Sequence, residues 1–307
     1  MTTLKRTIAH LAVLLAAQLL WPGIPHAQEP VTPDLKGAIA EQEAIYQGKE
    51  KQFLESYVVD RSLESYAETL PADFARSLAS LGPQDRWLDI GAGEADAILD
   101  YYNPNHDGTR AGRQPQGENK ASAVALSIED RRTARWHQTA AGLEGKKIQY
   151  FFGRYFREYP AQELGQFRLI TDLFGGFSYT TNLDLYMEKA LHALVSGGSL
   201  YTVLQDVHAE AGSNKPYYEG SPYLTELTHA DGTELRVCSW LKAISCVQVS
   251  CELRLEWKPP IEVYRVQKTC GEVRVPALVP EHFAAGIPPE RRFALRNPLP
   301  VPREAAR

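Results

Sequence analysis

The strongest constraint on the fold of this chain is a short apolar run that ends at closely spaced glycines. Residues 86–90 are expected to form a buried strand, Gly91 and Gly93 follow it, and a helix is expected over residues 95–102. Glycines at such a turn let the backbone approach a ligand closely, and the start of a helix offers unpaired N–H groups. The pattern therefore predicts a strand–turn–helix unit that faces a ligand, with Asp89 at the end of the strand.

Further strands and helices alternate along the chain after this unit. The expected buried strands cover residues 123–128, 148–152, 167–173 and 200–204, and the helices between them cover residues 129–141 and 183–194. In the second helix the expected inward side chains are Leu185, Met187, Ala190, Leu191 and Leu194. Strands that alternate with helices are typical of a parallel, doubly wound sheet, which binds ligands at the carboxyl ends of its strands.

The C-terminal quarter of the chain has a different pattern. Apolar residues alternate strictly with polar ones over residues 247–257, which predicts a strand with one buried face. Two prolines then turn the chain, and residues 261–266 return as a second strand. With the five preceding strands, this hairpin predicts an α/β fold with a mostly parallel seven-stranded sheet, closed by an antiparallel pair.

The first residues have the order of a secretory signal peptide. Lys5 and Arg6 form a short basic start, residues 8–21 form an apolar run, and Ala27 offers a small residue for cleavage. The run is shorter than the roughly 20 apolar residues of a transmembrane helix, so an uncleaved membrane anchor is the weaker alternative. We expect an exported protein, periplasmic or secreted, with no stable membrane span once residues 1–27 are removed.

Three parts are expected after the signal peptide. Residues 28–82 are predicted to be a linker and a helical extension, residues 83–275 the α/β domain, and residues 276–307 a proline-rich arm. Removing residues 1–27 takes away two bases and no acids, so 33 basic residues become 31 against 38 acidic ones, a net charge of −7 (31 − 38). An acidic chain without dense clusters of Lys and Arg is not expected to bind nucleic acid.

All four cysteines lie in the last quarter of the chain, at positions 238, 246, 251 and 270. In an exported protein an even, clustered set indicates disulfide bonds, and the pairing cannot be deduced from the spacing. Zinc is the competing interpretation. It is disfavoured because the region has no Cys-x-x-Cys pair and no histidine among the cysteines, so we expect no metal site.

Several segments together resemble one known family. The run Trp87-Leu88-Asp89-Ile90-Gly91-Ala92-Gly93 is similar to the first motif of the class I S-adenosylmethionine-dependent methyltransferases, which have a Rossmann-like fold. The resemblance continues through residues 124–130, Gly153, residues 167–172 and residues 194–200, and it ends with the closing hairpin. It covers roughly residues 84–270.

This resemblance implies that the chain binds S-adenosylmethionine. The residues that it assigns to the cofactor are Asp89, Gly91, Gly93, Ser127, Glu129 and Asp172. The chain departs from the family pattern at three positions. Ala95 stands at the third glycine position, Ser127 stands where a carboxylate usually accepts the ribose hydroxyls, and Arg154 stands where an acid often contacts adenine. Glu129 reaches the ribose only if its loop bends. As simpler interpretations, Asp89 caps a helix and the glycines only turn the chain.

Methyl transfer requires little chemistry from the protein, because the sulfonium methyl is already electrophilic and alignment supplies most of the catalysis. A base must lie at the carboxyl ends of the fourth and fifth strands, which makes Asp172 and His208 the catalytic candidates. The leading hypothesis is an exported methyltransferase that acts on a small molecule or an exposed protein group. The alternative is a non-catalytic exported binding protein that keeps the fold and uses its cleft for another ligand.

Overall fold

The strand that precedes the glycines is β1 (Arg86–Ile90), and its neighbours on either side are β2 (Ser122–Leu126) and β4 (Phe167–Asp172). The computed structural model describes residues 33–46, 60–103, 120–143, 145, 147–205, 225–257, 260–285 and 289–299. The signal peptide predicted for residues 1–27 lies outside these ranges. No described helix is both long enough and apolar enough to cross a bilayer.

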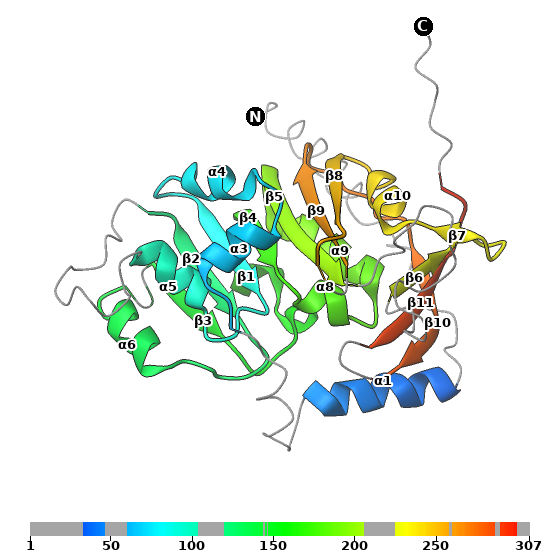
Figure 1. Cartoon of the computed structure of the whole chain (residues 1–307), viewed down its shortest axis with the longest axis horizontal. Coiled ribbons are helices and arrows are strands. Elements are labelled where there is room, and N and C mark those ends of the chain that lie inside the picture. The colour runs from blue at the N-terminus through cyan, green and yellow to red at the C-terminus, as the bar shows by residue number, and fades with distance from the viewer. Residues whose placement is uncertain are drawn as a thin grey trace, which may run out of the picture. The chain divides into compact units, whose positions relative to one another are not determined.

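Seven strands form the main sheet in the order β3-β2-β1-β4-β5-β9-β8 (Figure 1). The strands not yet located are β3 (Ile148–Phe151), β5 (Leu194–Gln205), β8 (Val247–Arg254) and β9 (Ile261–Lys268). The first five strands run parallel, whereas β9 pairs antiparallel with both β5 and β8. The predicted fold class, with its closing antiparallel hairpin, is confirmed.

Side chains of each central strand point alternately into two hydrophobic cores, because successive residues of a strand face opposite sides of a sheet. Trp87 is buried in one core and Leu88 in the other. The first core includes residues of α3 (Leu63–Thr69), α4 (Phe74–Ala79), α5 (Asp96–Tyr102) and α6 (Ala134–Ala140). The second includes residues of η1 (Phe156–Glu158), α7 (Ala161–Leu164), α8 (Gly176–Tyr179), α9 (Leu183–Ala193) and α10 (Val237–Lys242).

One side chain of α9 differs from the prediction. Leu185, expected to point inward, is 45% exposed. The inward stripe instead runs through Leu183, Tyr186, Met187, Ala190 and Leu191. The sequence pattern counts Leu185 as core because it is apolar, whereas its place on the helix turns it toward a cavity.

A second sheet of four strands has the order β10-β11-β6-β7. Its strands are β6 (Thr225–Thr228), β7 (Glu234–Leu235), β10 (Leu278–Ala284) and β11 (Glu290–Leu295). The last two fall within the segment for which the sequence predicts a proline-rich arm. Pro280 stands at a register shift between β10 and β11, a position where a strand tolerates proline. The helix α1 (Pro33–Tyr46) packs against β10 (Figure 1).

Disulfide bonds join Cys238 to Cys251 and Cys246 to Cys270. The first ties α10 to β8, and the second ties the start of β8 to the end of β9. The prediction of disulfide bonds is therefore confirmed. Cys238 and Cys251 also lie close to Glu262, but their sulfur atoms are bonded to each other rather than placed as separate ligands.

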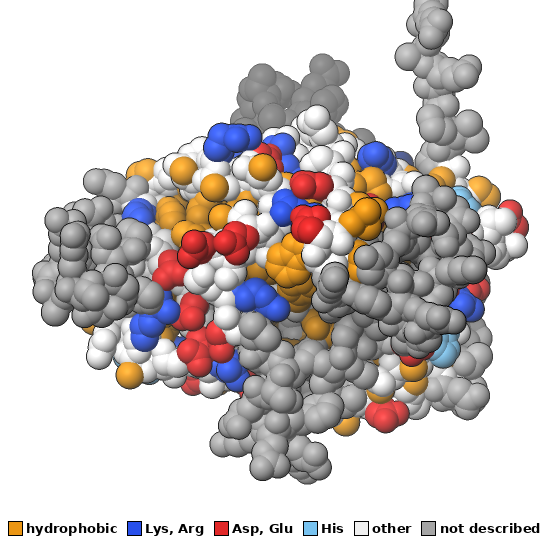
Figure 2. Space-filling model, in the orientation of Figure 1, with side chains coloured by type: hydrophobic (Ala, Val, Ile, Leu, Met, Phe, Trp, Pro, Cys, Tyr) orange, Lys and Arg blue, Asp and Glu red, His pale blue; other side chains and the backbone are white. Residues whose placement is uncertain are grey.

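On the face shown in Figure 2, acidic and basic side chains are interspersed over the described surface. Arg131, Arg132 and Arg135 form the densest basic spot of the sequence, and each pairs with nearby acids. Arg135, for example, lies 2.6 Å from Asp96 and 2.7 Å from Asp100. This distribution is compatible with the prediction that nucleic acid is not a partner.

Candidate functional site

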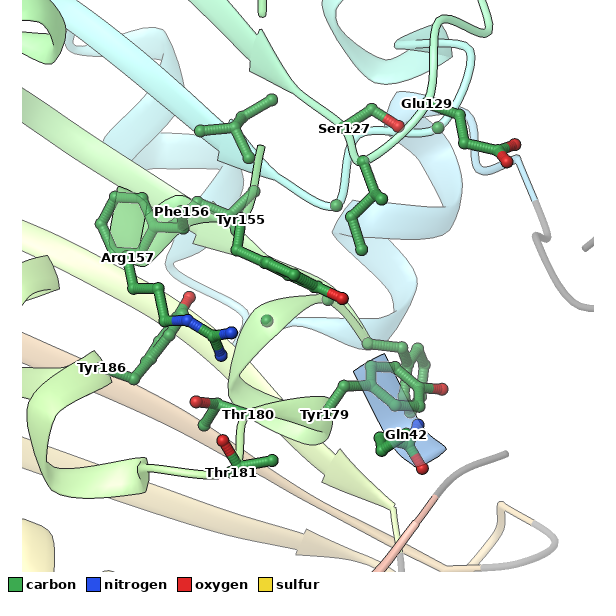
Figure 3. Close-up of a pocket in the computed structure, with 18 of the residues that line it drawn as sticks. Gln42, Ser127, Glu129, Tyr155, Phe156, Arg157, Tyr179, Thr180, Thr181 and Tyr186 are labelled. Carbon is green, nitrogen blue, oxygen red and sulfur yellow. The ribbon is translucent and has the colours of Figure 1, made fainter. Parts of the chain in front are cut away.

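A cavity of about 250 Å³ opens at the carboxyl ends of β1, β2 and β4 (Figure 3). The glycine loop after β1 lines one side, and the segment after β2 lines the next. The loop after β3 and the loop after β4 complete the wall. The lining residues are Gln42, Arg61, Ile90, Gly91, Gly93, Leu126, Ser127, Ile128, Glu129, Arg131, Tyr155, Phe156, Arg157, Phe174, Gly175, Gly176, Tyr179, Thr180, Thr181, Asn182, Leu185 and Tyr186.

The glycine loop has a left-handed backbone at three positions. The φ angles are 76° at Gly91, 56° at Gly93 and 63° at Ala95. The N–H groups of Gly91 and Ala92 both donate to the carbonyl of Leu126, at 2.9 and 3.0 Å, which binds the loop to the end of β2. Ala95 stands where the family pattern has a third glycine. It is buried and takes the left-handed conformation at a cost of roughly 1–2 kcal/mol.

Gly91 also touches the loop that follows β4. A Cβ atom built on Gly91 would lie 2.7 Å from the Cα of Gly175, closer than such atoms approach in proteins. A Cβ on Gly175 would in turn meet an oxygen of Asp172 at 2.9 Å. The two loops therefore pass backbone to backbone, and both positions require glycine for this reason.

Asp89 lies buried beneath the glycine loop rather than in the cavity wall. Its two carboxylate oxygens accept hydrogen bonds from the Tyr66 hydroxyl at 3.0 Å, and one also accepts from the Thr171 hydroxyl at 2.7 Å. Burial raises the pKa of Asp89 to about 7, although both hydrogen bonds act against the rise. The side chain predicted to bind the cofactor thus contacts Tyr66 and Thr171 and does not line the cavity.

Asp172 is also fully buried and is absent from the cavity wall. One oxygen accepts the N–H of Gly175 at 2.8 Å, and the other accepts the N–H of Phe177 at 2.9 Å together with the hydroxyl of Tyr186. Burial raises the pKa of Asp172 to about 6. Its contacts fix the conformation of residues 174–177, three of which line the cavity.

Ser127 and Glu129 both line the cavity, next to the glycine loop (Figure 3). The hydroxyl of Tyr150 lies 2.6 Å from the carbonyl oxygen of Gly93 and 3.3 Å from that of Glu129. One tyrosine of β3 therefore joins the glycine loop to the segment after β2. Of the six residues predicted to bind the cofactor, the structure brings Gly91, Gly93, Ser127 and Glu129 to one cavity.

Arg154, one of the departures from the family pattern, lies elsewhere. Arg154 is outside the cavity wall, where it pairs with Glu163 and its guanidinium carbon stands 4.0 Å from the ring centroid of Tyr159. His208, predicted as a catalytic candidate, lies outside the described residues.

Three arginines hold or line the site. The sequence pattern singles out none of them. Arg61 and Arg157 line the cavity, and their guanidinium carbons stand 4.9 Å from the Phe174 ring and 4.5 Å from the Tyr155 ring. Arg291 of β11 is 1% exposed. No motif marks these residues, because each reaches the site from a separate segment of the chain.

Arg291 also supports the loop after β4. Its guanidinium donates to the carbonyls of Phe177 at 3.1 Å and Thr180 at 2.8 Å, and to the hydroxyl of Thr225 at 2.7 Å. Asp172 accepts hydrogen bonds from N–H groups of this loop, and Arg291 donates hydrogen bonds to carbonyl groups of the same loop. The loop after β4, which forms part of the cavity wall, is thus held by the buried side chains of Asp172 and Arg291.

No protein-family model and no curated protein sequence matches this chain. Solved structures do show likeness. The 1,6-didemethyltoxoflavin-N1-methyltransferase of Burkholderia thailandensis matches 78% of this chain and 92% of its own, with 14% identity and a TM-score of 0.44. An rRNA methylase of Streptococcus thermophilus matches 63% of this chain and 92% of its own, with 11% identity and a TM-score of 0.36.

A third match is a candidate sarcosine dimethylglycine methyltransferase of Galdieria sulphuraria, with 19% identity and a TM-score of 0.33. The match covers 44% of this chain and 45% of that protein, so this chain spans less than half of its length. All three are methyltransferases by name. The seven-stranded sheet of this chain has five parallel strands and an antiparallel closing pair, the arrangement that the sequence resemblance implies.

Proposed function

We propose that this chain is an exported S-adenosylmethionine-dependent methyltransferase. The observation that carries the proposal is the cavity at the carboxyl edge of the sheet, where Gly91 and Gly93 meet Ser127 and Glu129. Doubly wound sheets bind their ligands at this edge. The cofactor supplies an electrophilic methyl group when it is bound, so the main task of the protein is to align an acceptor with that group.

The residues around the glycine loop are compatible with such a cofactor. Gly91 and Gly175, whose backbones approach each other closely, both line the cavity and present backbone rather than side chains to a ligand. Glu129 offers a carboxylate and Ser127 a hydroxyl to the ribose, and Ile128 offers an apolar contact to the base. We assign the amino-acid part of the cofactor to the backbone of Gly91 and Gly93.

Within this proposal Asp172 acts as a positioning residue. Both of its oxygens are occupied by groups of its own loop and by Tyr186, and none of its surface faces the cavity. We therefore propose that it orients residues 174–177 rather than taking a proton from the acceptor. His208 stays a catalytic candidate on sequence grounds alone.

The competing proposal is an exported binding protein without catalytic activity. Two departures favour it: Ser127 in place of an acid at the end of β2, and Arg154 turned away to Glu163. A hydrogen bond to a charged group contributes about 1.5–3 kcal/mol, so a missing ribose carboxylate weakens cofactor binding about tenfold or more.

Calorimetry on the chain that begins at Gln28 separates the two proposals. For an enzyme we expect S-adenosylmethionine and S-adenosylhomocysteine to bind with dissociation constants on the order of micromolar, a common range for enzyme ligands. Gly93→Arg should abolish that binding by filling the cavity. Gly271→Arg is the matched control, since Gly271 is exposed and a Cβ added to it would meet no atom within 4 Å. No binding of either ligand to the parent chain would favour the binding protein.

Export rests on the signal peptide predicted for residues 1–27 and is supported by the disulfides Cys238–Cys251 and Cys246–Cys270, which form in oxidising compartments. Expression of the full chain in a bacterium, followed by mass measurement of the protein in each fraction, tests it. We expect a product that begins near Gln28 in the periplasm or medium. A full-length product in the cytosol would contradict export.

A further inference from the structure

Arginines outnumber acids among the described residues that line the cavity. Arg61, Arg131 and Arg157 line it, and Glu129 is the one carboxylate among the described lining residues. A cavity lined by cations attracts anions, because low-dielectric walls focus the field of fixed charges. The three arginines occupy different parts of the wall, and their surroundings indicate different roles.

Arg131 belongs to the framework of the cofactor side. Its guanidinium lies 3.1 Å from the carboxylate of Asp60 and 4.0 Å from that of Glu94. The same Asp60 carboxylate accepts the N–H of Glu94 at 2.7 Å. Arg131 therefore helps to tie the segment after β2 to the glycine loop, and two acids balance its charge.

Arg61 also lies beside the glycine loop. It follows Asp60 in the chain, and its guanidinium carbon stands 4.9 Å from the ring of Phe174 in the loop after β4. This position suits the carboxylate of the amino-acid part of the cofactor. We therefore assign Arg61 and Arg131 to the cofactor side of the cavity.

Arg157 lies on another wall, in the 3₁₀ helix η1 after β3 (Figure 3). Lys189 of α9 donates to the backbone carbonyl of Arg157 at 2.7 Å, and the Glu158 carboxylate accepts the N–H of Tyr155 at the start of the same turn at 2.8 Å. The guanidinium carbon of Arg157 is 4.5 Å from the Tyr155 ring centroid. A stacked arginine on a hydrogen-bonded turn is a preorganised site for a carboxylate or phosphate.

The surroundings of Arg157 are aromatic. Tyr155, Phe156, Tyr179 and Tyr186 line the same cavity, and Thr180 and Thr181 add hydroxyl groups at its edge (Figure 3). Aromatic walls bury flat apolar groups, and a few polar side chains fix their orientation. The wall next to Arg157 thus combines an apolar surface with one positive charge.

We infer that the methyl acceptor is a small aromatic or similarly flat anion, a carboxylate or a phosphate ester, whose charged group binds Arg157. This inference rests on the proposed function, and it selects a small molecule over an exposed protein group. Arg157 is assigned to acceptor binding and specificity. The methyl transfer itself is left to alignment with the cofactor.

Benzoate and phenyl phosphate are suitable probes, with benzamide as the neutral counterpart of benzoate. At the efficiency typical of small ligands, benzoate should bind the protein loaded with S-adenosylhomocysteine with a dissociation constant on the order of 10 mM or tighter. Benzamide should bind at least about tenfold more weakly, because it lacks the charge that a guanidinium pairs with. Ligand-observed NMR measures both, and phenyl phosphate against benzoate shows which anion is preferred.

Arg157→Gln should weaken benzoate binding about tenfold and leave binding of S-adenosylhomocysteine unchanged, whereas Arg157→Lys should retain part of the benzoate affinity. Arg154→Gln is the matched control, since Arg154 lies in the same loop outside the cavity and pairs with Glu163. Equal binding of benzoate and benzamide, no binding of either, or no effect of Arg157→Gln would overturn the inference.

Failure of the proposed function gives a different result. In that case S-adenosylhomocysteine does not bind the parent chain. The preference for benzoate over benzamide, and its loss in Arg157→Gln, are then measured on the protein without cofactor. A preference that persists there supports an anion site in a binding protein, and its absence refutes the anion site as well.

Discussion

Gly91 and Gly175 face each other with no room for a side chain between them: a Cβ on Gly91 would stand 2.7 Å from the Cα of Gly175. The first follows β1 and the second follows β4, two strands that are neighbours in the sheet. Their contact makes the loops after these strands one continuous wall. Residues on either side of it, from Gly93 to Tyr186, line the same cavity.

We predict that Gly91→Ala destabilises the protein by about 2–4 kcal/mol and removes binding of S-adenosylhomocysteine, since it adds both a clash and the strain of a φ of 76°. Denaturation in urea and calorimetry measure the two effects. Gly142→Ala is the control, because Gly142 has a φ of 81° but no atom within 4 Å of its Cβ position. Equal losses in both variants would show that the contact with Gly175 contributes nothing.

Glu129→Gln tests the proposed ribose contact. We expect affinity for S-adenosylhomocysteine to fall about tenfold with little change in stability, because a charged hydrogen bond becomes a neutral one. Asp130→Asn serves as the comparison, since Asp130 is next in sequence, pairs with Arg132 at 2.8 Å and does not line the cavity. Unchanged affinity in Glu129→Gln would remove this residue from the site.

The buried acid Asp89 should make stability depend on pH. Its pKa is about 7 in the folded protein and about 4 in the unfolded chain, so between these values only the unfolded chain releases the proton. The parent should therefore lose stability relative to Asp89→Asn as the pH rises from about 4 to about 7, by up to a few kcal/mol, with no further change above. Urea denaturation at several pH values measures the difference.

Asp231 provides a comparison of opposite sign. Its exposed carboxylate accepts two hydrogen bonds from Thr233, which lower its pKa below the usual value. The parent should thus gain stability relative to Asp231→Asn as the pH rises through the acidic range. If the stability of the parent relative to each Asn variant changes with pH in the same direction at both positions, the pKa of Asp89 is not raised.

Replacement of Arg291 by methionine should loosen the loop after β4. It leaves the carbonyls of Phe177 and Thr180 without their donor, which costs on the order of 3 kcal/mol. Hydrogen exchange should accelerate at the N–H of Thr180, which donates to Gly176 at 2.8 Å. Arg292→Met, at an exposed position that pairs with Glu226, should stay within about 0.5 kcal/mol of the parent. Similar rates of hydrogen exchange in both variants would contradict the conclusion that Arg291 holds the loop after β4.

Loss of the disulfide between Cys238 and Cys251 should destabilise the protein by about 3 kcal/mol, because the bond closes a loop with a sequence separation of 13. The double variant Cys238→Ser/Cys251→Ser, unfolded in urea, measures this cost. The parent under reducing conditions should lose more, since the bond between Cys246 and Cys270, with a separation of 24, opens as well. A parent that is insensitive to reductant would contradict both expectations.

The main sheet could be predicted from sequence because its signals are local. The alternation over residues 247–257 and the glycines after residue 90 each depend on neighbours in the chain, and the structure confirms the resulting strands. The second sheet gives no such signal. Its strand β11 pairs in parallel with β6, more than sixty residues earlier, and Pro280 interrupts the pattern of β10.

The candidate site was predictable only in part, for a similar reason. Gly91, Gly93, Ser127 and Glu129 follow strand ends, and their place at the cavity follows from the order of the strands. An acid at the end of a strand can face a cavity or its own loop. Which of the two it faces depends on the backbone conformation of the residues that follow the strand. Asp172 faces its loop because the N–H groups of Gly175 and Phe177 point back at it, a detail that no periodic pattern records.

The position of Arg291 near the end of the chain has a consequence for biosynthesis. All seven strands of the main sheet precede residue 269, so they are synthesised before the residue that braces Phe177 and Thr180. A polypeptide is made from its N-terminus, and its earlier parts are able to collapse first. A nascent chain that stops before β11 therefore carries the glycine loop but lacks the guanidinium that donates to Phe177 and Thr180.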